Sequence, residues 1–280
     1  MWDCIIIGSG VAGVSAALTL KANGKEFLLL GSPELSGKIS RAERISNYPG
    51  LSAVSGAQFC EALKNQLKEA DIRVTDERVT GVYAMNGFFT VLTESGASFE
   101  GKTVILATGV EAVKSVPGEA EFVGRGVSYC ATCDGFLYKG KTIAVVCTSA
   151  RFYHEAQYLA SLAGKVYFVP LYKGEKELGN NAEIILKKPL RIEGGRRVEK
   201  LVFEGQEVAV DGVFFLKESV SPAVLVGGLE TEGGHVRVNR DMSTNLKGLF
   251  AAGDCTGRPY QYAKAAGEGN IAAHSVCDAE

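Results

Sequence analysis

The sequence of 280 residues contains no apolar run of about 18 residues, so it predicts no membrane-spanning helix. No basic start or cleavage site precedes Trp2, and we therefore expect no secretory signal. A net charge of −2 gives no electrostatic case for nucleic-acid binding. Seven cysteines, an odd number, do not form the disulfide scaffold of a small secreted domain. These absences favour a globular protein of the reducing cytoplasm, in which a disulfide is catalytic rather than structural.

Glycine is plentiful, with 34 residues, and its first cluster follows a predicted strand. Cys4–Ile7 is a continuous apolar run, typical of a strand that is buried on both faces. Gly8, Gly10 and Gly13 follow in a G-x-G-x-x-G pattern, and Val14–Asn23 is predicted to be a helix. Such glycines permit a tight turn, the approach of a pyrophosphate and close helix–strand packing. The segment predicts a dinucleotide site; the alternative is a glycine-rich turn without a ligand.

Four further segments bear on the identity of the dinucleotide. The next predicted strand, Glu26–Leu30, runs into Gly31 and Ser32 without the acidic residue that usually binds the ribose hydroxyls. Two later apolar strands end in small residues, within Val104–Gly109 and Gly248–Asp254. A predicted helix over residues 263–273 follows the second of them.

Together these segments resemble the FAD domain of the two-dinucleotide-binding flavoprotein disulfide reductases, and the resemblance covers nearly the whole chain. It implies that FAD is bound by small and polar residues at the strand ends and at the start of the last helix. These residues are Gly8, Ser9, Gly10, Ala12, Gly13, Lys38, Asn47, Ala107, Thr108, Gly109, Gly253, Asp254, Gln261, Tyr262 and Ala263.

Within that set, the resemblance implies that Asp254 binds the ribityl hydroxyls of FAD and that Asn47 and Gln261 lie near the flavin ring. The alternative for Asp254 is a turn or helix-capping aspartate. Lys38 stands where the family usually has a glutamine near the flavin, and a cation there would stabilise the anionic reduced form. The alternative for Lys38 is an ordinary surface lysine.

The segment Cys130-Ala131-Thr132-Cys133-Asp134 carries two thiols two residues apart. Thiols at this spacing can close a small disulfide, and the spacing lowers a thiol pKa. The alternative is half of a zinc site, which needs a second pair of ligands at suitable spacing. The other cysteines are isolated in the sequence, and Cys147 and Cys255 are expected to fill small buried spaces.

This motif, with Tyr129 before it and Gly135 after it, resembles the redox motif of the low-molecular-weight bacterial flavoprotein thioredoxin reductases. In that family the motif lies in a second domain inserted into the FAD domain. The resemblance implies that Cys133 takes electrons from the flavin and that Cys130 attacks the thioredoxin disulfide. It also implies that Asp134 donates and accepts the protons that thiol–disulfide exchange requires.

The insert departs from that family where NADPH should bind. Between a predicted strand, Thr142–Val146, and a predicted helix, Tyr153–Leu162, the segment 147–152 has no glycine, and Phe152 stands where a small residue is expected. The basic segment for the 2′-phosphate is replaced by 170–172, and the later histidine-and-proline loop by 217–219. These three losses argue against NADPH as the electron donor.

The pattern resembles the NADPH-independent, ferredoxin-dependent flavin thioredoxin reductases of anaerobic bacteria. It implies an enzyme that passes electrons from reduced ferredoxin through FAD and the cysteine pair to thioredoxin. FAD fits this role because ferredoxin gives one electron at a time and a disulfide needs two. Two alternatives stay open: an NADPH-dependent thioredoxin reductase with an atypical nucleotide site, and a non-enzymatic flavin-binding redox sensor.

The expected fold class is α/β, with two Rossmann-like three-layer domains of the two-dinucleotide-binding flavoprotein fold. The FAD-binding domain is expected over residues 1–114 and 242–280, and the reduced, inserted redox-disulfide domain over 115–241. Strands are expected in the insert at residues 165–169, 201–203, 208–210 and 213–216. The resemblance implies a homodimer, with thioredoxin and ferredoxin as partners and no metal, nucleic acid or membrane.

Overall fold

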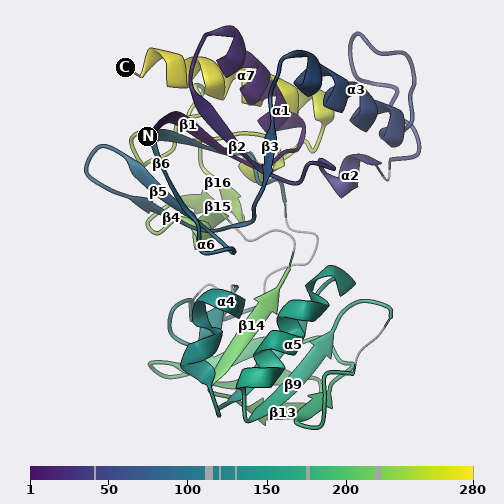
Figure 1. Ribbon diagram of the computed structural model, residues 1–280, viewed down its shortest axis with the longest axis vertical. Coiled ribbons are helices and arrows are strands. Elements are labelled where there is room, and N and C mark those ends of the chain that lie inside the picture. The colour runs from purple at the N-terminus through teal and green to yellow at the C-terminus, as the bar shows by residue number, and fades with distance from the viewer. Residues whose placement is uncertain are drawn as a thin grey trace. The chain divides into compact units, whose positions relative to one another are not determined.

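The computed structural model describes residues 1–40, 42–110, 116–119, 121–129, 131–174, 177–217 and 222–279 (Figure 1). The chain forms two compact units, and each is described by itself. The first unit comprises Met1–Thr93, Ala97–Val110 and Leu225–Glu280, and the second comprises Glu94–Gly96 and Glu111–Val224. Within the described ranges, every helix is too short or too polar to traverse a lipid bilayer.

The first unit is built on one mixed sheet. Its strands are β1 (Trp2–Ile7), β2 (Phe27–Gly31), β3 (Val74–Asp76), β4 (Val79–Ala84), β5 (Phe89–Thr93), β6 (Ser98–Leu106) and β17 (Leu249–Ala251). They follow the order β3-β2-β1-β6-β5-β4, and β17 pairs with the end of β6. β3, β2, β1, β6 and β17 run parallel, whereas β4 and β5 form an antiparallel hairpin beside β6. The carboxyl ends of β1, β6 and β17 therefore meet at one edge.

Helices cover one face of this sheet. They are α1 (Val11–Ala22), α2 (Gly37–Ser40), α3 (Gly56–Glu69) and α7 (Tyr262–Asp278). Cys4 and Ile6, which alternate with Ile5 and Ile7 along β1, lie in one buried cluster with residues of α1, α3 and α7. Figure 1 shows these three helices together on the same side of β1, β2 and β3. α1 begins at Val11 rather than at Val14, because Gly10 already provides the extended N-cap residue.

The second unit is a smaller three-layer sandwich. Its central sheet is parallel, and its strands are β7 (Val127–Ser128), β8 (Thr142–Cys147), β9 (Lys165–Pro170), β10 (Ala182–Ile184) and β14 (Gly212–Leu216), in the order β10-β9-β8-β14-β7. A helical layer consists of α4 (Ala131–Asp134), two short 3₁₀ helices (Gly135–Tyr138 and Ala150–Phe152) and α5 (Tyr153–Leu162). An antiparallel sheet of β11 (Arg191–Gly194), β12 (Val198–Phe203) and β13 (Gln206–Ala209) contacts β14 through β12.

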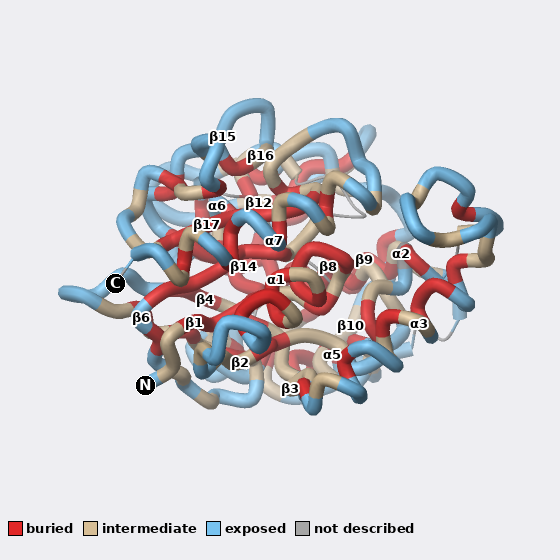
Figure 2. Tube along the Cα trace, turned by 90° about the horizontal axis from the view of Figure 1, so that it is seen from above, coloured by how far each residue is buried: buried red, intermediate tan, exposed pale blue. Residues whose placement is uncertain are grey.

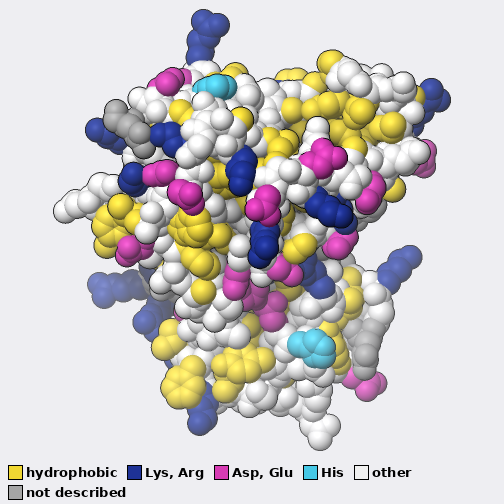
Figure 3. Space-filling view, turned by 45° about the horizontal axis from the view of Figure 1, so that its top comes forward, with side chains coloured by type: hydrophobic (Ala, Val, Ile, Leu, Met, Phe, Trp, Pro, Cys, Tyr) yellow, Lys and Arg dark blue, Asp and Glu magenta, His cyan; other side chains and the backbone are white. Residues whose placement is uncertain are grey.

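The expected class and three-layer architecture are confirmed, and the buried strands of both sheets stand out in Figure 2. Charged side chains of both signs are interspersed on the face shown in Figure 3, in keeping with the net charge of −2.

The second domain boundary differs from the expected one. The sequence predicts residues 225–241 to belong to the insert, but they cluster with the first unit. Val226, which follows the short helix α6 (Pro222–Leu225), forms a parallel bridge with Val82 of β4. The ribbon of β15 (Thr231–Glu232) and β16 (His235–Val236) then packs near the turn after β17. The bridge between Val226 and Val82 is not visible in a local pattern, because the two residues lie far apart in the sequence. The first expected boundary, at residue 114, lies outside the described residues.

Candidate active site

In the turn between β1 and α1, two glycines are tightly packed against the backbone and a third has free space beside it. Gly8 has a φ of +115°, and a Cβ on it would lie 2.3 Å from the Ala107 carbonyl oxygen. A Cβ on Gly13 would lie 1.8 Å from the Gly8 carbonyl oxygen, so a side chain would separate α1 from β1. At Gly10, no described atom lies within 4 Å of a Cβ position. The turn thus combines tight packing with free space at the amino end of α1, where amide groups and the helix dipole favour an anion.

The missing acidic residue after β2 has a steric explanation. A Cβ on Gly31 would lie 2.7 Å from the Ser9 hydroxyl oxygen and 2.8 Å from the Ser9 amide nitrogen. The Ser9 hydroxyl in turn donates a hydrogen bond to the Ser32 carbonyl oxygen over 2.8 Å. Ser9 therefore ties the first turn of the site to the end of β2, and no side chain fits at position 31.

The end of β6 contributes the second wall of this edge. The Ala107 amide donates to the Ile7 carbonyl oxygen over 2.8 Å, which continues the pairing of β6 with β1. Gly109 has a φ of +67°, the left-handed conformation that glycine adopts most readily. The Thr108 hydroxyl oxygen is buried, and among the described residues it has no oxygen or nitrogen partner, only the neighbouring Cys255 thiol. A buried polar atom without a strong partner is costly, so this hydroxyl is suited to a ligand.

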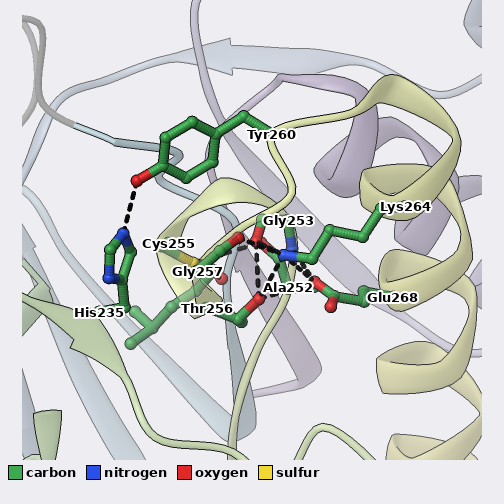
Figure 4. A network of polar contacts seen from close by, with 10 residues as sticks. His235, Ala252, Gly253, Cys255, Thr256, Gly257, Tyr260, Lys264 and Glu268 are labelled. Carbon is green, nitrogen blue, oxygen red and sulfur yellow. Dashed lines mark hydrogen bonds and ion pairs between the residues drawn. The ribbon is translucent and has the colours of Figure 1, made fainter. Parts of the chain in front are cut away.

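The turn after β17 carries Asp254 and is held by a polar network from α7 (Figure 4). Nζ of Lys264 donates to the carbonyl oxygens of Gly253 and Gly257, each over 2.8 Å. It also contacts the Thr256 hydroxyl at 2.8 Å and a carboxylate oxygen of Glu268 at 3.1 Å. That same oxygen accepts the Gly253 amide over 2.8 Å. The network fixes the backbone on both sides of Asp254.

The expected ring-side residues come together from opposite ends of the first unit. Nδ2 of Asn47 donates to Oε1 of Gln261 over 2.7 Å. Beside them, the rings of Tyr48 and Phe59 lie 4.9 Å apart, and those of Phe59 and Tyr262 lie 5.6 Å apart. Burial, and secondarily the charge of Asp254, raises the pKa of the Tyr262 hydroxyl. The three tilted aromatic rings and the amide pair place apolar and polar groups side by side, as binding of a flavin ring requires.

Ala263 is an exposed residue in the first turn of α7. Ala12 is buried in α1, and its carbonyl oxygen lies 2.2 Å from a Cβ position on Gly269 of α7. The side chain of Lys38 lies outside the described residues. The remaining residues expected to bind the cofactor therefore gather around one sheet edge and the first turns of α1 and α7. The free space at Gly10 and the buried Thr108 hydroxyl are features that an extended dinucleotide would use at this edge.

Residues Ala131–Asp134 of the redox motif form the single turn of α4 in the second unit. Cys133 is exposed and is held in a disulfide, whereas Cys130 lies outside the described residues. Asp134, one residue on, accepts a hydrogen bond from the Ser128 hydroxyl over 2.7 Å. Ser128 is buried at the end of β7, so the sheet fixes the position of its hydroxyl. A carboxylate whose position is fixed by a hydrogen bond thus directly follows the exposed, disulfide-bonded Cys133 in the sequence.

A buried ion pair lies next to this motif and was not found from the sequence. Lys217 and Glu119 form a salt bridge, and their side chains are 5% and 1% exposed. The Tyr129 hydroxyl donates to the same Glu119 oxygen over 2.6 Å, and the Val116 amide donates to the other oxygen over 2.8 Å. Lys217 also lies 5.2 Å from the centre of the Tyr129 ring. Both carboxylate oxygens of Glu119 thus have partners, and Tyr129 is linked through Glu119 to Lys217, the residue after β14.

The region expected to have lost a nucleotide site is filled by protein. Phe152 is 2% exposed and packs in one cluster with Cys147 and Leu159 of β8 and α5. The Cys147 thiol donates to the Ser149 carbonyl oxygen over 3.2 Å, inside the turn itself. An aromatic ring therefore occupies the strand–helix junction that is close-packed through glycine in nucleotide-binding units.

The expected packing roles of two isolated cysteines are confirmed, because Cys147 and Cys255 are fully buried. Burial raises the pKa of each thiol to about 11. Among the described residues, no group of three or more His, Cys, Asp or Glu side chains is placed to hold a metal ion.

Sequence reasoning missed Lys264, Glu268, Glu119 and Lys217. Lys264 and Glu268 stand four residues apart in a predicted helix, which is a recognisable signal for an ion pair. Their contacts with the turn at Gly253 could not be read from that spacing. Glu119 and Lys217 are 98 residues apart, and no local pattern connects them.

Comparison with known proteins gives concordant matches. The pyridine nucleotide-disulphide oxidoreductase family matches residues 2–269. Thioredoxin reductase of Helicobacter pylori is 35% identical over 304 residues, which covers 99% of this chain and 98% of that protein. Thioredoxin reductase of Aquifex aeolicus is 34% identical over 275 residues, which covers 91% of this chain and 85% of that protein.

Solved structures extend the likeness to the fold. The crystal structure of a ferredoxin-flavin thioredoxin reductase from Clostridium acetobutylicum is 45% identical, with a TM-score of 0.88 and coverage of 99% of this chain and 97% of that one. A thioredoxin reductase from Gloeobacter violaceus is 31% identical, with a TM-score of 0.75 and coverage of 98% and 92%.

Proposed function

The chain belongs to the pyridine nucleotide-disulphide oxidoreductase family and, within it, to the thioredoxin reductases, and on this premise we propose that it passes electrons from reduced ferredoxin through FAD and a Cys130–Cys133 disulfide to thioredoxin. The single observation that carries the choice of donor is the buried ring of Phe152. It stands where a second nucleotide would need a close approach to the backbone. The similar protein from Clostridium acetobutylicum is named for ferredoxin, which supports the same donor.

We place FAD in the first unit. The amino end of α1 at Gly10 would hold the pyrophosphate, and Asp254 would bind the ribityl hydroxyls. Asn47, Gln261 and Tyr262 would lie against the ring. When bound, FAD supplies a redox centre that accepts single electrons and delivers them in pairs to a disulfide.

Thiol–disulfide exchange then proceeds on the chain's own residues. The Cys130 thiolate attacks one sulfur of the thioredoxin disulfide, the S–S bond breaks, and the other sulfur leaves as a thiolate. The Cys133 thiolate next attacks the Cys130 sulfur in the mixed disulfide. The intramolecular disulfide forms, and the second thioredoxin sulfur leaves. Two electrons have moved from the enzyme dithiol to thioredoxin, so bonds and electrons balance.

Proton transfer in this exchange falls to Asp134. Its carboxylate accepts the proton of the attacking thiol and returns it to the departing thioredoxin thiolate. The Ser128 hydroxyl, 2.7 Å from Oδ2, restricts the carboxylate to one orientation beside the cysteine pair. Ser128 is a positioning residue, because it contacts Asp134 rather than a reacting sulfur.

The proposal includes a reducing cytoplasmic setting and a homodimer. Cys4, Cys60, Cys147 and Cys255 are free thiols, as expected of a chain that works where thiols stay reduced. Light scattering of the purified protein tests the homodimer directly.

A donor screen tests the proposed function. The holoprotein is mixed with thioredoxin and with reduced ferredoxin, NADPH or NADH at saturating concentration, and new thioredoxin thiols are counted. We expect turnover with ferredoxin only. Comparable turnover with NADPH would return the chain to the NADPH-dependent enzymes. Failure of both ferredoxin and a chemical reductant to support turnover would favour a redox sensor.

A further inference from the structure

Lys264 is a cation at an electrostatically unfavourable position. α7 starts at Tyr262 with Gln261 as its N-cap residue, so Lys264 lies in the first helical turn. The amino end of a helix carries partial positive charge and disfavours a cation there. The ion pair with Glu268 also has lysine before glutamate, the weaker orientation for residues four apart. Helix stability alone therefore does not account for Lys264.

The contacts of the amine point to the neighbouring turn instead. Nζ lies 2.8 Å from the Gly253 carbonyl oxygen, 2.8 Å from the Gly257 carbonyl oxygen and 2.8 Å from the Thr256 hydroxyl (Figure 4). The side chains of Lys264 and Glu268 are only 18% and 17% exposed. The three N–H groups of the amine thus donate hydrogen bonds mainly to one five-residue turn, Gly253–Gly257, and are largely shielded from bulk water.

Glu268 holds the same turn from the other side. Its Oε2 accepts the Gly253 amide over 2.8 Å and lies 2.8 Å from the Thr256 hydroxyl. The N–H of Gly253 is therefore bound by the carboxylate and its C=O by the amine. Gly253 and Gly257 have φ values of +88° and +117°, so the turn is bounded by the residue type with the greatest conformational freedom. Without an external restraint, such a turn would sample several conformations.

Asp254 follows the doubly held Gly253 residue. It is half-buried and lies within the short 3₁₀ helix Asp254–Thr256. The direction of the Asp254 side chain depends on the backbone to which Lys264 and Glu268 are hydrogen-bonded. We propose that Lys264 is a positioning residue for the cofactor: together with Glu268 it fixes the Gly253–Gly257 turn so that Asp254 is presented to FAD. This inference rests on the proposed function in one respect, the binding of FAD by Asp254.

The test measures release of FAD from the holoprotein after dilution, followed by the recovery of FAD fluorescence. Lys264→Met keeps the aliphatic stem and removes the charge and the donors. We expect release about 10- to 100-fold faster, the equivalent of one lost charge-assisted hydrogen bond. Lys264→Arg should retain most of the affinity. The matched control, Lys247→Met at an exposed lysine outside the network, should release FAD like the unsubstituted protein.

Epistasis with Asp254 separates positioning from mere stabilisation of the helix. If Lys264 acts through Asp254, then Lys264→Met combined with Asp254→Asn should release FAD no faster than Asp254→Asn alone. Two effects that multiply would overturn the proposal, as would unchanged release in Lys264→Met. Should Lys264→Met fail to fold, Thr256→Val removes one contact of the amine, and the same comparison with Asp254→Asn decides.

The two proposals fail in distinguishable ways. An unsubstituted protein that binds no FAD would defeat both. A protein that binds FAD and reduces thioredoxin, but releases FAD at the same rate with and without Lys264, would defeat this inference alone. A protein whose FAD release depends on Lys264, but which turns over with NADPH, would defeat only the donor assignment.

Discussion

Nδ2 of Asn47 donates a hydrogen bond to Oε1 of Gln261 over 2.7 Å, although 214 residues separate them in the sequence. Asn47 precedes α3, and Gln261 is the N-cap residue of α7, whose own side chain makes no capping bond. The amide of Gln261 is therefore directed at Asn47 rather than at its own helix. The bond joins two distant parts of the first unit at the place expected for the flavin ring.

Loss of either amide should weaken FAD binding, because the remaining partner is left without its hydrogen bond. We expect Asn47→Leu and Gln261→Leu to be coupled by about 0.5–1.5 kcal/mol in a double-mutant cycle on FAD affinity. Fluorescence titration of the four proteins measures the coupling, with Asn65→Leu on the exposed side of α3 as the control. Strictly additive effects would show that the two amides act separately.

Asp134→Asn should lower thioredoxin turnover by roughly 10²- to 10⁴-fold, the usual contribution of a general acid–base group. FAD content should not change, because Asp134 belongs to the second unit. Ser128→Ala should give a smaller loss and an altered pH profile, since the carboxylate keeps its charge but loses a fixed hydrogen bond. Turnover with a chemical reductant over a range of pH tests both. Glu204→Gln, at an exposed turn of the same unit, is the control, and equal loss there would refute the assignment.

Removing one member of the buried ion pair should be costly. Lys217→Met leaves the carboxylate of Glu119 buried without its cation, so we expect a loss of about 3–5 kcal/mol in the free energy of unfolding. Adding Glu119→Gln should restore part of that loss, because the uncompensated charge disappears. Urea denaturation measures both, against Lys188→Met at an exposed site. A double variant less stable than Lys217→Met would contradict this account.

The parts of the molecule that follow from short patterns could be predicted from the sequence. The turn at Gly8, the buried strands and the exposed Cys133 each depend on a few neighbouring residues. The residues that stabilise the site could not be predicted, because they depend on contacts between segments that are distant in the sequence. Val226 pairs with Val82, and Lys217 reaches Glu119, only after the sheets have formed. Even Lys264, which is close to Asp254 in sequence, contacts the carbonyl oxygens of Gly253 and Gly257 only because of the path of an irregular turn.

The buried thiols should be inert in the native protein. Burial raises the pKa of Cys147 and of Cys255 to about 11, so only about one thiol in a thousand is ionised at pH 8. The thiolate fraction, and with it the rate of alkylation, should rise as the pH approaches 11. Mass spectrometry after iodoacetamide treatment at pH 8 should show label on Cys133 only after reduction of the disulfide, and little on the buried pair. Equal labelling of native and unfolded protein at Cys147 would contradict its burial.

Glycine substitutions should not restore NADPH use, because the space that the nucleotide would need is filled by side chains of the hydrophobic core. Phe152 is 2% exposed and packs against β8 and α5, so Phe152→Ala should cost about 3–5 kcal/mol in the free energy of unfolding. Leu186→Ala, at a side chain that is 71% exposed, is the control and should change stability by less than about 0.5 kcal/mol.

A variant that combines Ser149→Gly with Phe152→Ala still lacks the arginines for the 2′-phosphate. Each missing charge-assisted hydrogen bond lowers affinity by roughly 1.5–3 kcal/mol, and two of them weaken binding by two to four powers of ten. Stopped-flow mixing with NADPH should therefore show no flavin reduction at rates near turnover, in the parent or in the variant. Rapid bleaching of the flavin in the double variant would mean that the aromatic ring alone had closed a working nucleotide site.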